Sequence, residues 1–388
     1  MSASDPQGAR LGSLDRLLAS HEMALVCGAG GVGKTTIAAS LATMAACNHR
    51  GRVLVLTIDP AKRLADALGV GAMDNHEHRV ALDRFSEAGL SPRGELWAAM
   101  LDTEASWEAL VARHAPDEST REKILSNPLF RNIAARFVQS HDYIAAERLF
   151  ELHSGGDYDL IVVDTPPSRH ALDFLDAPGR MSDFFSSRLL RWLVMPSRSR
   201  LLGLASKPFH QIAQRVLGEQ FLGDVSQFFA LLQTMQEGFT ERARAVARLL
   251  SDSRTSFVVV SSLETAPLKE ARGFADELGR RGLHLGAIVV NRVLPSYMAD
   301  PSLLRTAREL SDRAAALAAA LPTDTDLSAR VLSEAATSFS NFNLVATMQS
   351  ERIESLAKGF DVIATAPAFP QGVASLEGLV ALGETIWT

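Results

Sequence analysis

Residues 23–37 carry the residue types and the spacing that bind the phosphate chain of a nucleotide. The apolar residues 23–27 predict a short buried strand, and the alanine-rich residues 36–47 predict a helix. Between these two elements, residues 28–35 fit the pattern G-x-x-x-x-G-K-T. Glycines here let consecutive backbone N–H groups approach phosphate oxygens, and the start of the helix adds a partial positive charge.

This pattern predicts a role for each part of the loop. The Lys34 ammonium would reach the β- and γ-phosphates of a nucleoside triphosphate and assist catalysis, and the Thr35 hydroxyl would bind Mg²⁺. The predicted nucleotide-binding residues of the loop are Gly28, Ala29, Gly30, Gly31, Val32, Gly33, Lys34, Thr35 and Thr36.

A dinucleotide-binding loop is the alternative interpretation of the same glycines. They also fit G-x-G-x-x-G, and Asp59 follows the next apolar run, where a ribose-binding carboxylate could lie. Lys34 and Thr35, directly after the last glycine, favour the triphosphate site because a dinucleotide site needs neither. A second acidic strand end, at Asp164, also fits a metal-dependent nucleoside triphosphatase.

Further apolar runs predict a parallel sheet around this loop. Their lack of polar alternation is typical of strands that are buried on both faces. The predicted strands cover residues 23–27, 52–58, 96–101, 158–164, 256–260, 285–290 and 360–365. Because helical patterns alternate with these strands, we expect an α/β fold, a doubly wound and mostly parallel sheet of the P-loop NTPase kind.

Two long helical stretches, residues 103–152 and 176–250, interrupt this alternation. We predict one domain over residues 1–388 in which both stretches are insertions that form a helical subdomain. The large apolar residues of the second stretch include Phe184, Trp192, Phe228 and Met235. Such residues fit either helices packed into a core or a groove for a hydrophobic client, and periodicity leaves both interpretations open.

Composition and charge limit the classes of protein to which the chain can belong. The chain of 388 residues has a net charge of −6, so we expect no polyelectrolyte binding of nucleic acid. Its first ten residues lack the apolar segment of a signal peptide, and no stretch approaches the ~20 apolar residues of a membrane span. Cys27 and Cys47 lack C-x-x-C spacing and predict neither a disulfide framework nor a zinc site. We expect a cytoplasmic protein.

Segments spread along most of the chain match one known family. T-I-D-P-A at residues 57–61 and D-T-P-P-S-R-H at residues 164–170 look like its two switch segments. V-V-N-R at residues 289–292 looks like its adenine-reading strand end, and residues 367–388 look like its C-terminal loop and helix. With the phosphate loop, these segments resemble the ArsA-type anion-pump ATPases and the ATPases that target tail-anchored proteins, both with a deviant Walker A loop.

The resemblance implies ATP and Mg²⁺ as cofactors and a dimer that closes and opens with nucleotide state. Asp59 would position or polarise the attacking water, and both Asp59 and Asp164 would hold the Mg²⁺ shell through water. Asn291 would hydrogen-bond the adenine edge, and Pro367 and Phe369 would flank the base. These residue types suit phosphoryl transfer, which needs positioning and charge compensation. ATP is favoured over GTP because the chain has no N-K-x-D guanine motif.

Three features depart from the family pattern. The family carries a lysine before the Gly-Gly pair that reaches the partner subunit's nucleotide, and Ala29 stands at that position. A methyl group cannot neutralise phosphate charge, so we expect slow hydrolysis unless a paralogous subunit, Arg63 or Arg169 supplies the charge. The zinc-binding C-x-x-C of the eukaryotic targeting dimers is absent, and two cysteines cannot form the cluster that captures arsenite.

Three hypotheses about function follow. The first is a Mg²⁺-dependent ATPase that works as a homodimer or a heterodimer and carries or targets a hydrophobic client such as a membrane protein. The second is the soluble ATPase subunit of an arsenite-type anion export system with a membrane partner. The third is a weakly hydrolysing regulatory subunit of a heterodimer, which Ala29 suggests.

Overall fold

The computed structural model describes residues 13–58, 63–71, 73–127, 130, 138–186, 219–322, 324–360, 362–369 and 372–387. These residues form an eight-stranded sheet in the order β3-β4-β2-β5-β1-β6-β7-β8, with β1 near its centre. The strands are β1 (Met23–Gly28), β2 (Arg52–Thr57), β3 (His78–Arg79), β4 (Glu95–Met100), β5 (Leu160–Asp164), β6 (Thr255–Ser261), β7 (Leu285–Val293) and β8 (Ile363–Pro367).

The predicted fold class is confirmed. β1 pairs in parallel with both β5 and β6, and among the strands of the described residues only the short edge strand β3 runs antiparallel to its neighbour. Alternate residues of β1 enter two separate cores, with Leu25 on one face of the sheet and Val26 on the other. Both side chains are fully buried, which explains why this strand reads as an uninterrupted apolar run.

One face of the sheet is covered by the first and the last helix of the described chain and by the helices that follow β1, β2 and β3. These helices are α1 (Leu14–Ser20), α2 (Lys34–Asn48), α3 (Arg63–Leu68), α4 (Leu82–Glu87) and α18 (Leu376–Ile386). Ser13 and Ser375 cap α1 and α18 by accepting bonds from the backbone N–H of Arg16 and Gly378. The helix predicted for residues 36–47 is α2, which begins two residues earlier.

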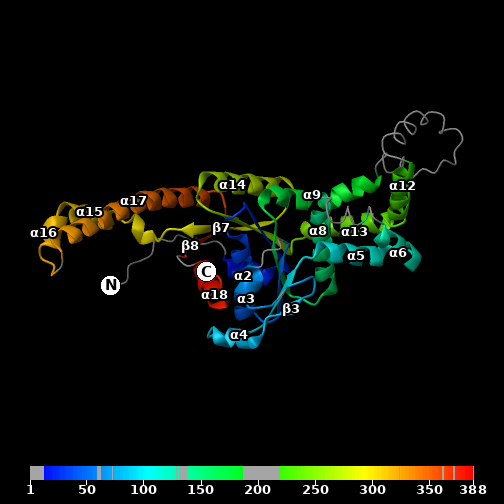
Figure 1. Cartoon of the computed structure of the whole chain (residues 1–388), viewed down its shortest axis with the longest axis horizontal. Helices are drawn as coiled ribbons and strands as arrows, with labels where there is room; N and C mark the ends of the chain where they lie inside the picture. Colours follow the sequence, from blue (N-terminus) through cyan, green and yellow to red (C-terminus); the bar gives the residue numbers. More distant parts are fainter. Residues whose placement is uncertain are drawn as a thin grey trace, which may run out of the picture.

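The opposite face carries the helices of the two predicted insertions together with α14 (Figure 1). They are α5 (Thr103–His114), α6 (Glu118–Ser126), α8 (Val138–Gly155), α9 (Ser168–Ser186), α12 (Glu219–Gln233), α13 (Gln236–Leu250) and α14 (Thr265–Arg280). Phe228 and Met235 are each 1% exposed, so these two are core residues and not the lining of an open groove. The side chains of Phe184 and Trp192 lie outside the described part of the chain.

A helical hairpin extends from the end of β7 and returns to β8, and in Figure 1 it projects away from the sheet. We call residues 296–357 the arm. It consists of a 3-10 turn, η1 (Ser296–Ala299), and of α15 (Pro301–Asp312), α16 (Ala314–Ala318) and α17 (Thr325–Ala357). Neither α17 nor any other helix of the described residues is long and apolar enough to cross a membrane.

Candidate nucleotide-binding site

The loop after β1 needs glycine at two positions where the structure leaves no room for a side chain. A Cβ at Gly28 would collide with the backbone carbonyl of Val260 in the neighbouring strand β6. Gly33 has a φ of +98°, and a Cβ there would collide with the Asn291 side chain. The predicted G-x-x-x-x-G spacing therefore corresponds to two points of close approach at the start and the end of the loop.

Lys34 is the first residue of α2, and its ammonium folds back under the loop. Lys34 Nζ donates to the carbonyl oxygen of Ala29 at 3.0 Å, and the side chain is 8% exposed. Ala29 itself is 7% exposed, so its methyl group lies against the protein. Among the described residues of the loop and the first turn of α2, Lys34 thus supplies the one buried ammonium group, which lies beside the positive end of the α2 dipole.

The structure brings together Thr35, which we predict to bind Mg²⁺, and Asp164, which we predict to hold the Mg²⁺ shell through water. Thr35 Oγ1 donates to Asp164 Oδ2 at 2.6 Å, and Thr57 Oγ1 donates to the same oxygen at 3.0 Å. Asp164 ends β5 between β1 and β2, where the carboxyl ends of three parallel strands meet. Thr57 begins the segment 57–61 that resembles the first switch, but it was not predicted as a site residue, since threonine at a strand end has many other uses.

These oxygens fit a magnesium ion. Mg²⁺ prefers hydroxyl and carboxylate oxygens, takes one or two of them from the protein, and completes its shell with phosphate oxygens and water. No cluster of three or more His, Cys, Asp or Glu side chains among the described residues could hold a metal by itself. Asp59, the other predicted catalytic and metal-site residue, lies outside the described residues, and so do the side chains of Arg63 and Arg169.

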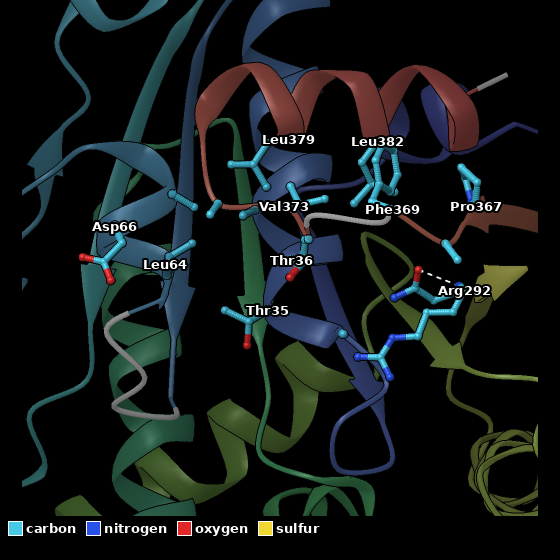
Figure 2. A pocket seen from close by; sticks show the side chains of 17 residues that line it. Thr35, Thr36, Leu64, Asp66, Arg292, Pro367, Phe369, Val373, Leu379 and Leu382 are labelled. Atoms are coloured by element: carbon cyan, nitrogen blue, oxygen red, sulfur yellow. Dashed lines mark hydrogen bonds between the residues drawn. The ribbon is translucent and has the colours of Figure 1, made fainter. Parts of the chain in front are cut away.

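A pocket of about 490 Å³ opens beside the N-terminus of α2 (Figure 2). It brings together six residues predicted from the sequence: Gly33, Thr35, Thr36, Asn291, Pro367 and Phe369. Residues that were not named individually as site residues complete the wall: Ala39, Leu64, Asp66, Ala67, Arg292, Ala368, Gly372, Val373, Ala374, Leu379 and Leu382. Four of these residues are apolar residues of α3 and α18. Helix α18 belongs to the segment 367–388 that resembles the family's C-terminal loop and helix, whereas α3 carries no sequence signal beyond ordinary core packing.

Asn291 links this pocket to the loop. Its Nδ2 donates to the carbonyl oxygen of Val32 at 2.8 Å, and its Oδ1 accepts from the Arg292 backbone N–H at 2.9 Å. Arg292 has a φ of +60°, a left-handed conformation that non-glycine residues rarely adopt. The end of β7 therefore makes a sharp local turn that holds the Asn291 amide against the loop.

Cys27 lies in the strand directly before the loop and is 1% exposed, as expected for a small core residue. Burial raises the pKa of its thiol to about 12, although the Thr165 hydroxyl and the Lys34 ammonium act in the opposite direction. The thiol is therefore neutral at physiological pH and is no candidate for a nucleophile or a soft-metal ligand.

Comparison with known proteins adds an independent finding. A family described as anion-transporting ATPase matches residues 21–317. The chain is 26% identical over 269 residues to "ATPase GET3" of Malassezia globosa, covering 69% of this chain and 71% of that protein. It is 24% identical over 277 residues to "ATPase ASNA1 homolog 1" of Paramecium tetraurelia, covering 69% and 74%. For "ATPase GET3" of Rhodotorula glutinis the identity is 27% over 295 residues, covering 75% and 76%.

Proposed function

This chain belongs to the anion-transporting ATPase family and is an ATP hydrolase, and on this premise we propose a Mg²⁺-dependent ATPase whose dimer opens and closes with nucleotide state. The single observation that carries the proposal is the 2.6 Å hydrogen bond from Thr35 Oγ1 to Asp164 Oδ2. It joins the first turn of α2 to the end of β5, beside the loop that would hold the phosphates.

Each residue of the site has its own role in phosphoryl transfer. The backbone N–H groups of the loop and the N-terminus of α2 bind the phosphates, and Lys34 turns from the Ala29 carbonyl to the β- and γ-phosphates. Thr35 would hold Mg²⁺ and Asp164 would hold its shell through water, and the ion would supply positive charge to the phosphates. Asp59 positions the attacking water, and Asn291, Pro367 and Phe369 hold the adenine.

We propose that ATP hydrolysis drives the carriage or targeting of a hydrophobic membrane-protein client. The resemblance of the switch segments to those of the ATPases that target tail-anchored proteins supports this hypothesis, and the chain is similar to proteins named ATPase GET3 and ATPase ASNA1 homolog 1. The buried Phe228 and Met235 cannot form the client surface in this conformation, so the client has to contact other residues of the helical subdomain. The family description, anion-transporting ATPase, is consistent with the second hypothesis, an anion exporter.

The cysteines argue against an exporter of arsenite. Cys27 precedes α2 and Cys47 lies near the other end of that helix, so roughly 20 Å of helix separates them. A metalloid that needs several thiolates therefore cannot be held by this chain alone.

Steady-state ATP hydrolysis by the purified chain tests the proposal, measured with and without Mg²⁺ beside Lys34→Ala and Ala29→Lys. We expect Mg²⁺-dependent turnover that Lys34→Ala lowers by about 100-fold or more, because one buried ammonium is lost from the phosphate site. Ala29→Lys should raise the rate. A wild-type chain that binds ATP but turns over only after addition of a paralogous subunit would support the regulatory hypothesis instead.

The client hypothesis needs a separate experiment. A soluble fusion carrying a C-terminal apolar helix of about 20 residues is offered to the chain, and capture is measured with and without ATP. We expect capture that depends on nucleotide state and disappears when two aspartates are placed in the apolar helix. Capture that ignores the aspartates would contradict the hypothesis.

A further inference from the structure

Strand β7 has one residue more than its neighbour β8 where the two strands reach the pocket. Val290 pairs with Thr365 and Val293 pairs with Pro367, so three steps along β7 match two steps along β8. Such an extra residue is a β-bulge, and bulges next to functional sites change the direction in which a side chain points. Arg292 lies in this bulge, and its φ of +60° is the one positive φ of a non-glycine residue in the described part of the chain.

The bulge reverses the alternation of side chains along β7. Val289 packs in the core on the α2 side of the sheet, and Val290 packs in the core on the opposite side. Uninterrupted alternation would continue with Asn291 on the α2 side and Arg292 on the opposite side. Instead Val293 packs against the opposite core, and Arg292 lines the pocket beside the N-terminus of α2. The bulge therefore presents Asn291 and Arg292 in succession to the pocket.

Arg292 begins close to the phosphate loop. Nδ2 of the preceding residue, Asn291, donates to the carbonyl oxygen of Val32 at 2.8 Å and leaves no room for a Cβ at Gly33. Successive Cα atoms are about 3.8 Å apart, so the Arg292 side chain starts one residue away from a group that touches the loop. Figure 2 shows this side chain running from the end of β7 toward the N-terminal end of α2, away from Pro367.

The guanidinium of Arg292 is an unpaired positive charge at this pocket. Of the described residues that line the pocket, only Asp66 and Arg292 carry a charge. The Arg292 side chain is exposed, and its guanidinium forms no hydrogen bond or ion pair with a described residue. A left-handed conformation costs free energy, and a solvated surface arginine gains nothing in return. Residues that keep such strain cluster at functional sites.

We propose that Arg292 contacts the phosphate chain of the bound nucleotide, an inference that rests on the proposed function and adds a residue to that site. A planar guanidinium can donate two parallel hydrogen bonds to phosphate oxygens, and it stays charged at physiological pH. Lys34 provides one positive charge, bonded to the carbonyl oxygen of Ala29, and the methyl group of Ala29 provides none. Arg292 provides a second charge from the Gly33 end of the loop.

The adenine ring is the other part of a nucleotide that a guanidinium can bind, by stacking on the face of the ring. In the proposed site the base lies beside Pro367 and Phe369. Because Arg292 points away from Pro367 and toward α2, contact with the phosphates fits the geometry better than stacking on the base.

Calorimetric titration of the full chain with ATP and Mg²⁺ tests the proposal. Arg292→Gln should raise the dissociation constant of ATP at least tenfold, because a charge-assisted contact with phosphate is lost. Inorganic tripolyphosphate has the phosphates without the base, and its affinity, measured by competition with ATP, should fall by a similar factor. Arg308→Gln is the matched control, since it removes an exposed arginine of α15 and changes the net charge equally. Its affinity for ATP should stay within twofold of wild type.

Arg292→Gly separates nucleotide binding from folding. Glycine adopts a positive φ without steric cost, so this variant removes the guanidinium and the strain together. It should unfold at the temperature of wild type or above it, while its affinity for ATP falls at least tenfold. A loss of affinity that appears only together with a loss of stability would indicate a structural role for Arg292 and would overturn the proposal.

Two further results would overturn this inference and leave the proposed function intact. One is an ATP affinity of Arg292→Gln equal to wild type, in a chain that loses ATP binding in Lys34→Ala. The other is a loss of ATP affinity without a loss of tripolyphosphate affinity, which would assign Arg292 to the adenine ring. A wild-type chain that does not bind ATP would overturn the proposed function and this inference together.

Discussion

Gly33, near the end of the loop after β1, is a position that tolerates little change. Its φ of +98° lies in the left-handed region, and a Cβ would meet the amide of Asn291. We expect Gly33→Ala to lower the free energy of unfolding by at least about 1–2 kcal/mol, the cost of a left-handed conformation for a residue with a Cβ. Denaturant unfolding measures this loss.

Gly30→Ala is the matched control, because Gly30 has no positive φ and nothing lies within 4 Å of its added Cβ. We expect its stability to remain within about 0.5 kcal/mol of wild type. Equal losses for the two variants would contradict the conformation described for the loop.

The Cys27 thiol gives a prediction that depends on pH. With its pKa raised to about 12 by burial, only about one thiol in 10⁴ is ionised at pH 8, against roughly a quarter at an ordinary cysteine pKa. Alkylation of Cys27 in the native chain should therefore be negligible at pH 8 and become fast in urea. Mass spectrometry of the labelled peptides measures both rates, and rapid native labelling would contradict the burial described here.

The residues of the site that could be predicted from sequence are those whose chemistry is unusual at their position. Lys34 and Thr35 after a glycine loop, and Asp164 after an apolar run, each have few alternative explanations. Thr57 shares the Asp164 oxygen with Thr35 but is an ordinary strand residue. Its partner is 107 positions away, and pairing at that separation depends on strand order, which periodicity does not contain.

At the scale of elements, the contact between α18 and α2 forms one wall of the pocket. Gly383 of α18 lies against Met44 and Ser40, and a Cβ there would collide with the Met44 side chain. Leu379 and Leu382 on the same helix line the pocket. We expect Gly383→Val to push α18 outward, to cost about 1–3 kcal/mol of stability and to weaken ATP binding.

Two measurements separate these effects. Calorimetric titration with ATP reports the pocket, and thermal unfolding reports the packing. Gly273→Val is the matched control, because Gly273 is an exposed glycine of α14 with nothing within 4 Å of its added Cβ. If both variants bind ATP as tightly as wild type, α18 does not shape the part of the pocket that we propose to hold the adenine base.

The strands could be predicted to within a few residues because all but the edge strands are buried apolar runs. β3 was not predicted, since its residues His78 and Arg79 are polar and pair only with the edge strand β4. The arm was also missed as a projecting unit. Its apolar residues face both inward and outward along α17, so hydrophobic periodicity indicates helices there without indicating which face is buried.

At the scale of the whole molecule, the root of the arm borders the pocket that we propose to hold the nucleotide. A second pocket of about 560 Å³ lies between the root of α17 and β8, and Pro367 lines both pockets. The Leu294 backbone N–H donates to Gln349 Oε1 at 2.8 Å, and so ties the segment after Asn291 and Arg292 to α17. A change in the part of the pocket near Asn291 can therefore be transmitted to the arm through a short stretch of backbone and one hydrogen bond.

Hydrogen exchange of the full chain follows from this arrangement. ATP with Mg²⁺ should slow exchange in residues 294–299 and near Gln349, because a base held between Asn291 and Phe369 restrains the left-handed turn at Arg292. Gln349→Ala removes the bond to Leu294, so protection should then stop at the end of β7 while ATP affinity changes little. Lys34→Ala, which weakens phosphate binding, should lose protection in both segments. Protection of the loop after β1 without any change at the arm root would mean that the arm is not coupled to the nucleotide.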